Sequence, residues 1–204
     1  MPVGESAGLM PMGELSGLLS LRGSPRLWLA EGLVAPAEVE RLLALAGDAA
    51  WRAARGVASR HDRTGFSCEL PIAGDPLIAA VAGRIEATVG LRNEVGGTLR
   101  FRRYAVGEGH PPHLDTYEFA GLHLVATAML CLVGPELGGE TCFPRARPPA
   151  TIGLRAGQLL HWYNYTPEGA EDRASWHLGL SVLRGAKVTL TAFIYAAIER
   201  ACGV

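Results

Sequence analysis

Hydrophobic residues in the first half of the chain recur with the period of an α-helix. Over residues 39–46 they follow the i, i+3, i+4, i+7 spacing, directly after Pro36, and this spacing places side chains on one face of a helix. A similar spacing runs over residues 78–89. Here Asp75-Pro76 is a helix start signal and Gly90 a stop signal, because Asp caps free N–H groups and Gly adopts the left-handed conformation. The pattern therefore predicts two amphipathic helices.

From Thr98 onward, the pattern changes to short runs rich in β-branched and aromatic residues, separated by Gly and Pro. Such runs are typical of strands joined by tight turns. The apolar stretch 128–133 is too short to span a membrane and is expected to be a central strand buried on both faces. The fold class that follows is α+β, mainly β, with a sandwich or jelly roll and helices packed on one face. The strands are predicted at 98–105, 123–133, 151–154, 157–163, 176–184 and 187–196.

Residues 1–25 differ from the rest of the chain, because they are rich in glycine and have little periodicity. We expect a flexible N-terminal tail here and a single domain over residues 26–204. A secretion signal is not expected, since Glu5 and Glu14 precede Arg22 and the apolar runs are short. The chain has 204 residues, of which 49% are hydrophobic, and this is enough to bury the core of one domain.

Charge and cysteine content narrow the classes of partner. The formal net charge is −1, and no basic run is longer than Arg102-Arg103, so neither nucleic acid nor an anionic membrane is expected as a partner. The four cysteines form no CxxC pair and lie too far apart for a zinc ribbon or a dense disulfide framework. Free thiols are expected, and with them a reducing compartment and a cytoplasmic location.

The candidate chemistry begins with His113-Leu114-Asp115. On an extended segment, residues at i and i+2 point to the same face, so the imidazole and the carboxylate are aimed at one point. A second histidine from a distant strand would complete the two-histidine, one-carboxylate triad that binds Fe(II), and His177 is the candidate. Because HxD is also common in ordinary loops, the context has to decide. Lys187, the only lysine, lies ten residues after His177 and is either part of the site or an exposed strand end.

A series of motifs extends this constellation over most of the chain. In order, they are Tyr104, Gly107, His110, His113 and Asp115, then GGETCFP at 138–144, HWYN at 161–164, and the pair His177 and Lys187. In order and spacing, the motifs resemble those of the prolyl 4-hydroxylase-like branch of the Fe(II)/2-oxoglutarate-dependent oxygenases, across about residues 28–196. That family's pattern is Y-x-x-G-x-x-Y-x-x-H-x-D, with His110 here in place of the second tyrosine. The resemblance implies a double-stranded β-helix (jelly-roll or cupin-like) core.

The resemblance also implies roles for individual residues. The implied iron ligands and catalytic residues are His113, Asp115 and His177. Lys187 would pair with the distal carboxylate of 2-oxoglutarate, and the hydroxyl groups of Tyr104 and Thr141 would donate to it, since a buried dianion needs charge and hydrogen bonds to offset its desolvation. The implied reaction uses Fe(II), 2-oxoglutarate and O2, with ascorbate in support. It hydroxylates an unactivated aliphatic C–H bond and releases succinate and CO2.

Three positions that contact peptidyl proline in the resembling family differ here. They are His110, His123 and Phe193, where that family has Tyr, Arg and Trp. Arg63 lies in a segment that resembles the family's mobile lid and could offer a guanidinium to a carboxylate. We therefore expect these four residues to bind a small amino acid or an amino-acid-derived metabolite in a closed bowl. The alternatives are a peptidyl-prolyl 4-hydroxylase with an open groove for a protein substrate, and a non-catalytic metal-binding jelly-roll module, such as a zinc protein.

Overall fold

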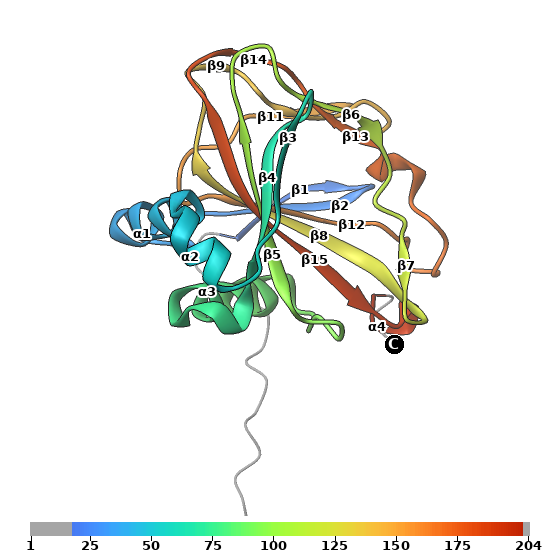
Figure 1. Ribbon diagram of the computed structural model, residues 1–204. Coiled ribbons are helices and arrows are strands. Elements are labelled where there is room, and N and C mark those ends of the chain that lie inside the picture. Colours follow the sequence, from blue (N-terminus) through green and yellow to red (C-terminus); the bar gives the residue numbers. More distant parts are fainter. Residues whose placement is uncertain (1–17, 202–204) are drawn as a thin grey trace, which may run out of the picture.

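The computed structural model describes residues 18–201, and its largest feature is a nine-stranded sheet (Figure 1). A four-stranded sheet packs against it, and two short strands form a third sheet. In spatial order, the large sheet consists of β1 (Leu18–Gly23), β2 (Arg26–Ala30), β12 (Leu159–Tyr163), β8 (Leu122–Val133), β15 (Lys187–Ala196), β5 (Thr98–Tyr104), β4 (Gly65–Pro71) and β3 (Ser59–Asp62), with β7 (Glu118–Phe119) paired to β8. The smaller sheets consist of β11 (Ala150–Ile152), β10 (Thr141–Phe143), β13 (His177–Gly179) and β6 (His110–His113), and of β14 (Val182–Arg184) and β9 (Leu137–Gly138).

The chain alternates between the large and the four-stranded sheet. After β5 it enters the small sheet at β6, returns to the large sheet at β8, and crosses again to β10 and β11. It returns at β12, crosses to β13 and ends in the large sheet at β15. This alternating antiparallel path is that of a jelly roll. The predicted α+β, mainly β, double-stranded β-helix is therefore confirmed.

Both predicted helices are present. α3 begins after Asp75, whose carboxylate accepts a hydrogen bond from the Leu77 N–H at 2.8 Å, and it ends at Gly90, which has φ of 77°. α1 begins with the N–H of Ala35 donating to Oε2 of Glu38 at 2.8 Å. Over the described part of the chain, the helical elements are α1 (Pro36–Gly47), α2 (Ala49–Ala54), α3 (Pro76–Val89), α4 (Ile198–Ala201) and the 3-10 turns η1 (Ile72–Gly74) and η2 (Arg173–Ser175).

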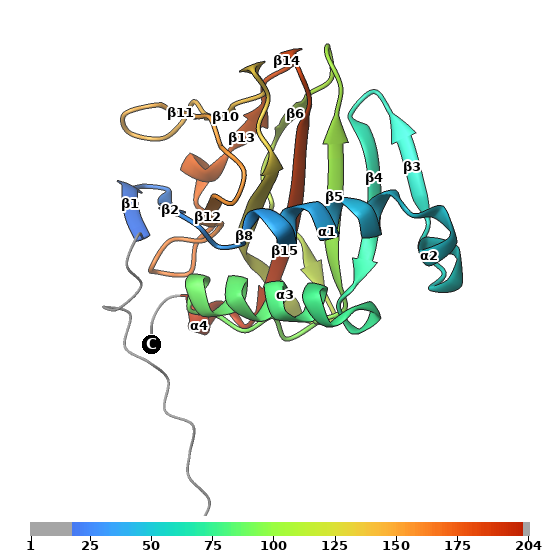
Figure 2. The same ribbon diagram turned by 90° about the vertical axis from the view of Figure 1, so that its left-hand side faces the viewer.

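α1 and α3 cover one face of the large sheet (Figure 2). Leu42 of α1 and Ile85 of α3 are completely buried in one cluster with Leu130 and Leu190 of the central strands. Burial of this size stabilises each helix by about 1.5–3 kcal/mol per large apolar side chain. Because helices close this face, the space available for a functional site lies on the other face, between the two sheets.

Two predicted boundaries are corrected by the structure. Of the flexible tail expected over residues 1–25, residues 1–17 lie outside the described residues, whereas residues 18–23 form β1 and pair with β2. The glycine-rich composition concealed this hairpin at the sheet edge. The single strand expected over 176–184 is two strands in different sheets, because the backbone at Leu180 donates to Glu140 and redirects the chain from β13 to β14.

Three cysteines fall within the described residues, and all are free: Cys68, Cys131 and Cys142. This agrees with the expected thiols, whereas Cys202 lies outside the described residues. Among residues 18–201, no helix is long and apolar enough to cross a membrane.

Candidate active site

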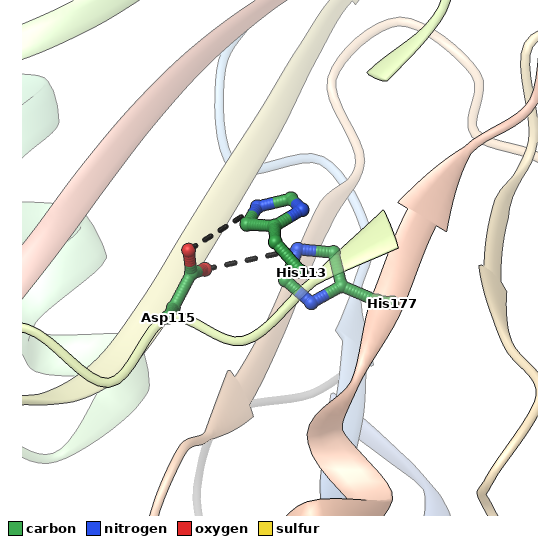
Figure 3. A group of neighbouring side chains, drawn as sticks. All are labelled: His113, Asp115 and His177. Carbon is green, nitrogen blue, oxygen red and sulfur yellow. Dashed lines mark ion pairs between the residues drawn. The ribbon is translucent and has the colours of Figure 1, made fainter. Parts of the chain in front are cut away.

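His113 and His177 lie opposite each other on two antiparallel strands of the small sheet. They are Cα partners in the register of β6 and β13, and Asp115 follows β6 along the chain. Nε2 of His113 lies 3.3 Å from Oδ1 of Asp115, and Nε2 of His177 lies 3.7 Å from Oδ2. Both imidazoles are directed at the carboxylate (Figure 3), and the three ligand atoms lie within 4.8 Å of one another. The structure therefore brings the predicted triad together at one point.

Backbone carbonyl groups orient both imidazoles. Nδ1 of His113 lies 2.9 Å from the carbonyl oxygen of Pro111, and Nδ1 of His177 lies 2.9 Å from that of Ser175. Because a carbonyl oxygen only accepts, Nδ1 carries a proton in each ring, and Nε2 is the nitrogen that a metal would take. Burial lowers the pKa of His113, but the hydrogen bond and the charge of Asp115 outweigh this, and the net shift is upward. Burial lowers the pKa of His177 to about 4, so this ring is neutral at neutral pH and available as a ligand.

Asp115 is buried but is held in its charged form. Burial raises the pKa of its carboxyl group, but the hydrogen bond with His113 and the charges of both histidines outweigh this, and the net shift is downward. The hydroxyl group of Thr127 donates to Oδ2 at 2.8 Å, and Nδ2 of Asn164 lies 3.3 Å from that hydroxyl oxygen. These two side chains orient the carboxylate. The sequence analysis did not identify either role, although Asn164 belongs to the HWYN motif.

Lys187 lies at the start of β15, and its ammonium group is buried near the triad. Nζ donates to the carbonyl oxygen of Gly139 at 2.7 Å and to Oγ1 of Thr141 at 3.3 Å. An ammonium group has three N–H donors, so one remains for a ligand, and the Thr141 hydroxyl keeps its own proton to donate. Burial lowers the pKa of Lys187 to about 8, which leaves the group cationic at neutral pH.

The carbonyl group of Gly139 reaches Lys187 because the backbone is left-handed there. Gly139 has φ of 73°, and a Cβ atom at this position would lie 2.9 Å from Cγ of Pro135. Only glycine accommodates both the conformation and the close approach. Tyr104 is the Cα partner of Lys187 in the register of β5 and β15, and only 9% of Tyr104 is exposed. Lys187, Thr141 and Tyr104 therefore share one region of the site.

The triad and the Lys187 region line a common cavity of ≈ 570 Å³ between the two sheets. Its rim carries Tyr117 and Phe119, which are 55% and 58% exposed. Two imidazole nitrogens and one carboxylate oxygen form the donor set that suits Fe(II) in oxygenases. A buried ammonium beside a hydroxyl group suits one carboxylate of a dianion. The residues present therefore fit both iron and 2-oxoglutarate.

Two of the four predicted substrate-binding residues line the cavity, and two do not. His110 and Phe193 belong to the lining. Arg63 is exposed in the turn between β3 and β4, and His123 is outside the lining although its neighbour Leu124 is within it. Successive residues of a strand face opposite sides of a sheet, so His123 is directed away from the site. This corrects the expectation of a bowl walled by Arg63 and His123.

Three arginines that the sequence pattern did not single out also line the cavity: Arg60, Arg100 and Arg102. Nε of Arg100 donates to Oε1 of Glu69 at 2.5 Å, and its guanidinium carbon lies 4.7 Å from the centre of the Phe193 ring. Arg100, Arg102 and Tyr104 alternate along β5 and therefore share a face. The pattern R-x-R-x-Y at residues 100–104 was the signal that could have identified them.

Comparisons with known proteins give relatives in sequence and in structure. No protein-family model matches the chain. The chain is 26% identical over 213 residues to probable prolyl 4-hydroxylase 7 of Arabidopsis thaliana, a match that covers 89% of this chain and 66% of that protein. It therefore spans about two thirds of the length of the first curated relatives that it matches.

Solved structures share the fold at lower sequence identity. The viral collagen prolyl hydroxylase of Paramecium bursaria Chlorella virus-1, solved with 2-oxoglutarate, has a TM-score of 0.64 and 19% identity over 84% of this chain and 96% of that chain. The epimerase SnoN from nogalamycin biosynthesis was solved with Fe3+, α-ketoglutarate and nogalamycin RO. It has a TM-score of 0.54 and 17% identity over 85% of this chain and 79% of that chain.

The jelly roll, the triad and these relatives define the class of the protein: it is a 2-oxoglutarate-dependent Fe(II) oxygenase. Within this class the chain resembles the prolyl 4-hydroxylase-like branch, because the curated relatives that it matches are prolyl 4-hydroxylases. The resemblance inferred from the motifs is thereby confirmed, as are the expected cofactors Fe(II) and 2-oxoglutarate.

Proposed function

We propose that this protein hydroxylates an unactivated aliphatic C–H bond of a small amino acid or an amino-acid-derived metabolite, with release of succinate and CO2. The observation that carries the reaction type is the presence of the triad and of buried Lys187 in one cavity. When bound, iron and 2-oxoglutarate supply the oxidising chemistry from O2. The remaining steps of binding and orientation belong to residues of this chain.

His113, Asp115 and His177 would hold the metal, and the charge of Asp115 offsets part of the charge of the cation. Lys187 and Thr141 would hold one carboxylate group of 2-oxoglutarate through the N–H and O–H donors that they have free. Burial of these groups excludes water, which strengthens each charged contact and protects the reaction from side products. The carbonyl groups beside the two imidazoles accept the Nδ1 protons and so keep Nε2 of each ring directed at the metal position.

The size and lining of the cavity support a small substrate. Its volume of ≈ 570 Å³ lies within the range of about 300–1,000 Å³ that is typical of sites for small ligands. His110 stands in the lining where the resembling family has a tyrosine, so a group that contacts the substrate has changed. These observations favour a compact polar substrate over an extended chain.

A peptidyl-prolyl 4-hydroxylase activity on a protein substrate is the second candidate. It is favoured by the names of the curated relatives, which are prolyl 4-hydroxylases. The exposed aromatic side chains of Tyr117 and Phe119 at the rim also offer a surface on which a peptide could pack. Both candidates use the same metal centre and differ only in what enters the cavity.

The deciding experiment measures succinate formed by the purified protein with Fe(II), ascorbate, O2 and 2-oxoglutarate. One set of reactions receives a pool of free amino acids, and a parallel set receives a pool of proline-containing peptides. We expect the free amino acids to stimulate succinate formation. Stimulation by the peptides alone would contradict the proposed substrate and support the second candidate.

The remaining alternative, a non-catalytic metal-binding module, is tested by the same protein without any added substrate. Binding of 2-oxoglutarate to the Mn(II)-loaded protein is measured by isothermal titration calorimetry. We expect one site that depends on the metal. No binding of 2-oxoglutarate, together with no succinate from either pool, would overturn the enzymatic function.

A further inference from the structure

Arg102 is a buried cation on the wall of the cavity. It lies on β5, where its Cα partners are Ser67 of β4 and Thr189 of β15, so it is in the interior of the large sheet. Only 8% of Arg102 is exposed. Its side chain belongs to the cavity lining together with that of His110, whose ring centre is 4.7 Å from the ring centre of His113. Arg102 is thus joined to the metal site through a single intervening side chain.

The hydrogen bonds of the Arg102 side chain are to neutral groups. Nη1 donates to Nδ1 of His110 at 3.0 Å and to Oγ1 of Thr64 at 3.4 Å. Among residues 18–201, no carboxylate lies within 4.0 Å of its guanidinium nitrogens. The side chain also hydrogen-bonds with the hydroxyl group of Tyr104, which is a further neutral partner. The hydrogen bonds to His110 and Thr64 both use Nη1, so an anion in the cavity could approach the guanidinium from the side away from Nη1.

The two neighbouring arginines of the lining are paired differently. Arg100 contacts Glu69 at 2.5 Å, and Nη1 of Arg60 lies 3.7 Å from Oδ2 of Asp62. A buried cation without a counter-ion is costly, because neutral hydrogen-bond acceptors do not replace the solvation that a charge loses. Planar, bidentate binding of a carboxylate by a guanidinium is the arrangement that removes this cost. Among the described residues, Arg102 is therefore the arginine of this cavity without a carboxylate in direct contact, since Asp62 reaches it only through the hydroxyl group of Thr64.

We propose that Arg102 binds the carboxylate group of the substrate, which is accordingly a free carboxylic acid such as an amino acid with an unmodified α-carboxylate. The inference rests on the proposed function and specifies its substrate class. Lys187, whose ammonium group has its own partners in Gly139 and Thr141, remains the group for 2-oxoglutarate, and Tyr104 lies between the two cations as the Cα partner of Lys187 and a hydrogen-bond partner of Arg102. An internal residue of a peptide has no free α-carboxylate and would leave Arg102 unpaired.

The first test changes the substrate and leaves the protein unaltered. Succinate formation is measured with a pool of free amino acids and, separately, with the same amino acids as α-carboxamides, which keep the shape but lose the charge. The proposal predicts stimulation by the acids, and about 10- to 100-fold weaker stimulation by the amides, the value of a charge-assisted hydrogen bond. Equal stimulation by both pools, or by neither, overturns it.

The second test changes Arg102 and compares it with its neighbour on the same strand. Arg102→Gln removes the charge, Arg102→Lys keeps the charge but loses the planar fork, and Arg103→Gln removes an exposed arginine on the opposite face. With the stimulating acid pool, Arg102→Gln is expected to raise the half-saturating concentration about 10- to 100-fold. Arg102→Lys should have an intermediate effect, and Arg103→Gln should match the parent protein.

Binding of 2-oxoglutarate to the Mn(II)-loaded variants separates this inference from the proposed function. If Arg102 serves the substrate, Arg102→Gln binds 2-oxoglutarate as tightly as the parent protein does. Weakened 2-oxoglutarate binding in Arg102→Gln, with no change toward the acid pool, would assign Arg102 to the co-substrate and overturn the inference. Failure of the parent protein itself to bind 2-oxoglutarate would instead overturn the proposed function.

Discussion

Two groups of side chains in the cavity differ in how completely their charges are paired. The metal end consists of the triad and Lys187, and the substrate end consists of Arg100, Arg102 and the rim. At the metal end, Asp115 receives hydrogen bonds or charges from three side chains, and Lys187 donates to a carbonyl and a hydroxyl oxygen. At the substrate end, Arg102 is equally buried but has only neutral partners, and Tyr117 at the rim is exposed. The comparison indicates that the metal end is organised by the protein alone. The other end is completed by a group that arrives with the substrate.

The largest expected effect comes from removing the charge of the metal end. Asp115→Ala takes one of the three ligand groups away and leaves two neutral imidazoles, which bind a divalent cation far more weakly. We expect succinate formation to fall below detection and Mn(II) binding to be lost in calorimetry. Glu136→Ala, which removes an exposed carboxylate paired with Arg184, is the matched control and should behave as the parent protein. Turnover by Asp115→Ala would contradict the assignment of the triad.

A smaller effect on succinate formation is expected when the cation of the predicted co-substrate pocket is removed. Lys187→Ala removes one charge-assisted hydrogen bond, and the half-saturating concentration of 2-oxoglutarate should rise about 10- to 100-fold. Metal binding should be unchanged, because Lys187 is not a ligand. Steady-state titration of 2-oxoglutarate checks the first point and Mn(II) calorimetry checks the second. Equal apparent affinity for 2-oxoglutarate in the variant and the parent would remove Lys187 from the site.

Thr127→Val tests whether the orientation of Asp115 matters as well as its charge. The substitution keeps the shape of the side chain but removes the hydroxyl group that donates to Oδ2. Loss of such a supporting hydrogen bond weakens metal binding by about 10- to 100-fold. Thr88→Val, which removes a hydroxyl group that bonds within α3, is the control. If both variants bind Mn(II) equally well, the contact with Thr127 has no role at the metal.

The pH dependence of 2-oxoglutarate binding should reveal the burial of Lys187. Its pKa is lowered to about 8 by burial, so the ammonium form is complete well below pH 8 and is lost as the pH rises through that value. Binding should therefore weaken above pH 8, by up to about tenfold per pH unit. Calorimetry between pH 6.5 and about 9.5 measures the slope, and the same slope in Lys187→Ala would show that another group is responsible.

The smallest effect is expected where an arginine of the substrate end already has its anion. Arg100→Gln leaves Glu69 without its partner, but Arg100 is partly exposed and its charge is already neutralised by that contact. We expect the half-saturating concentration of the acid pool to change by less than about threefold, since exposed ion pairs contribute little. A larger change in the half-saturating concentration for Arg102→Gln than for Arg100→Gln would separate an arginine without a carboxylate partner from one that has such a partner. An equal or larger effect at Arg100 would remove that distinction.

The metal end could be predicted from the sequence because its residues occur in motifs of fixed spacing. His113-x-Asp115, the GGET segment that contains Gly139, and the ten-residue separation of His177 and Lys187 each specify one strand end. The structure places these strand ends around one cavity, as predicted. The helices could likewise be predicted from the sequence, since the cap at Asp75 is an interaction between residues that are close in the chain.

The substrate end was less predictable because its geometry depends on pairing between distant strands. The register of β8 and β15 shifts between Ile194 and Tyr195, whose partners are Ala126 and Leu124. This irregularity lets both Leu124 and Thr127 line the cavity, although strict alternation would separate them. The face of the sheet on which a strand residue such as His123 lies therefore could not be deduced from its position in the motif alone.

The sequence by itself determined the class of fold and the two main helices, because these depend on local period, and the resemblance of its motifs to a known family gave the residues that are predicted to hold metal and co-substrate. Only the tertiary structure decided which polar side chains reach the cavity and which of them lack a partner. Arg100 and Arg102 are two residues apart on one face of β5, yet one meets Glu69 and the other does not meet a carboxylate in the described chain. That difference is set by the side chains that neighbouring strands place beside each arginine, which is a property of the assembled sheet.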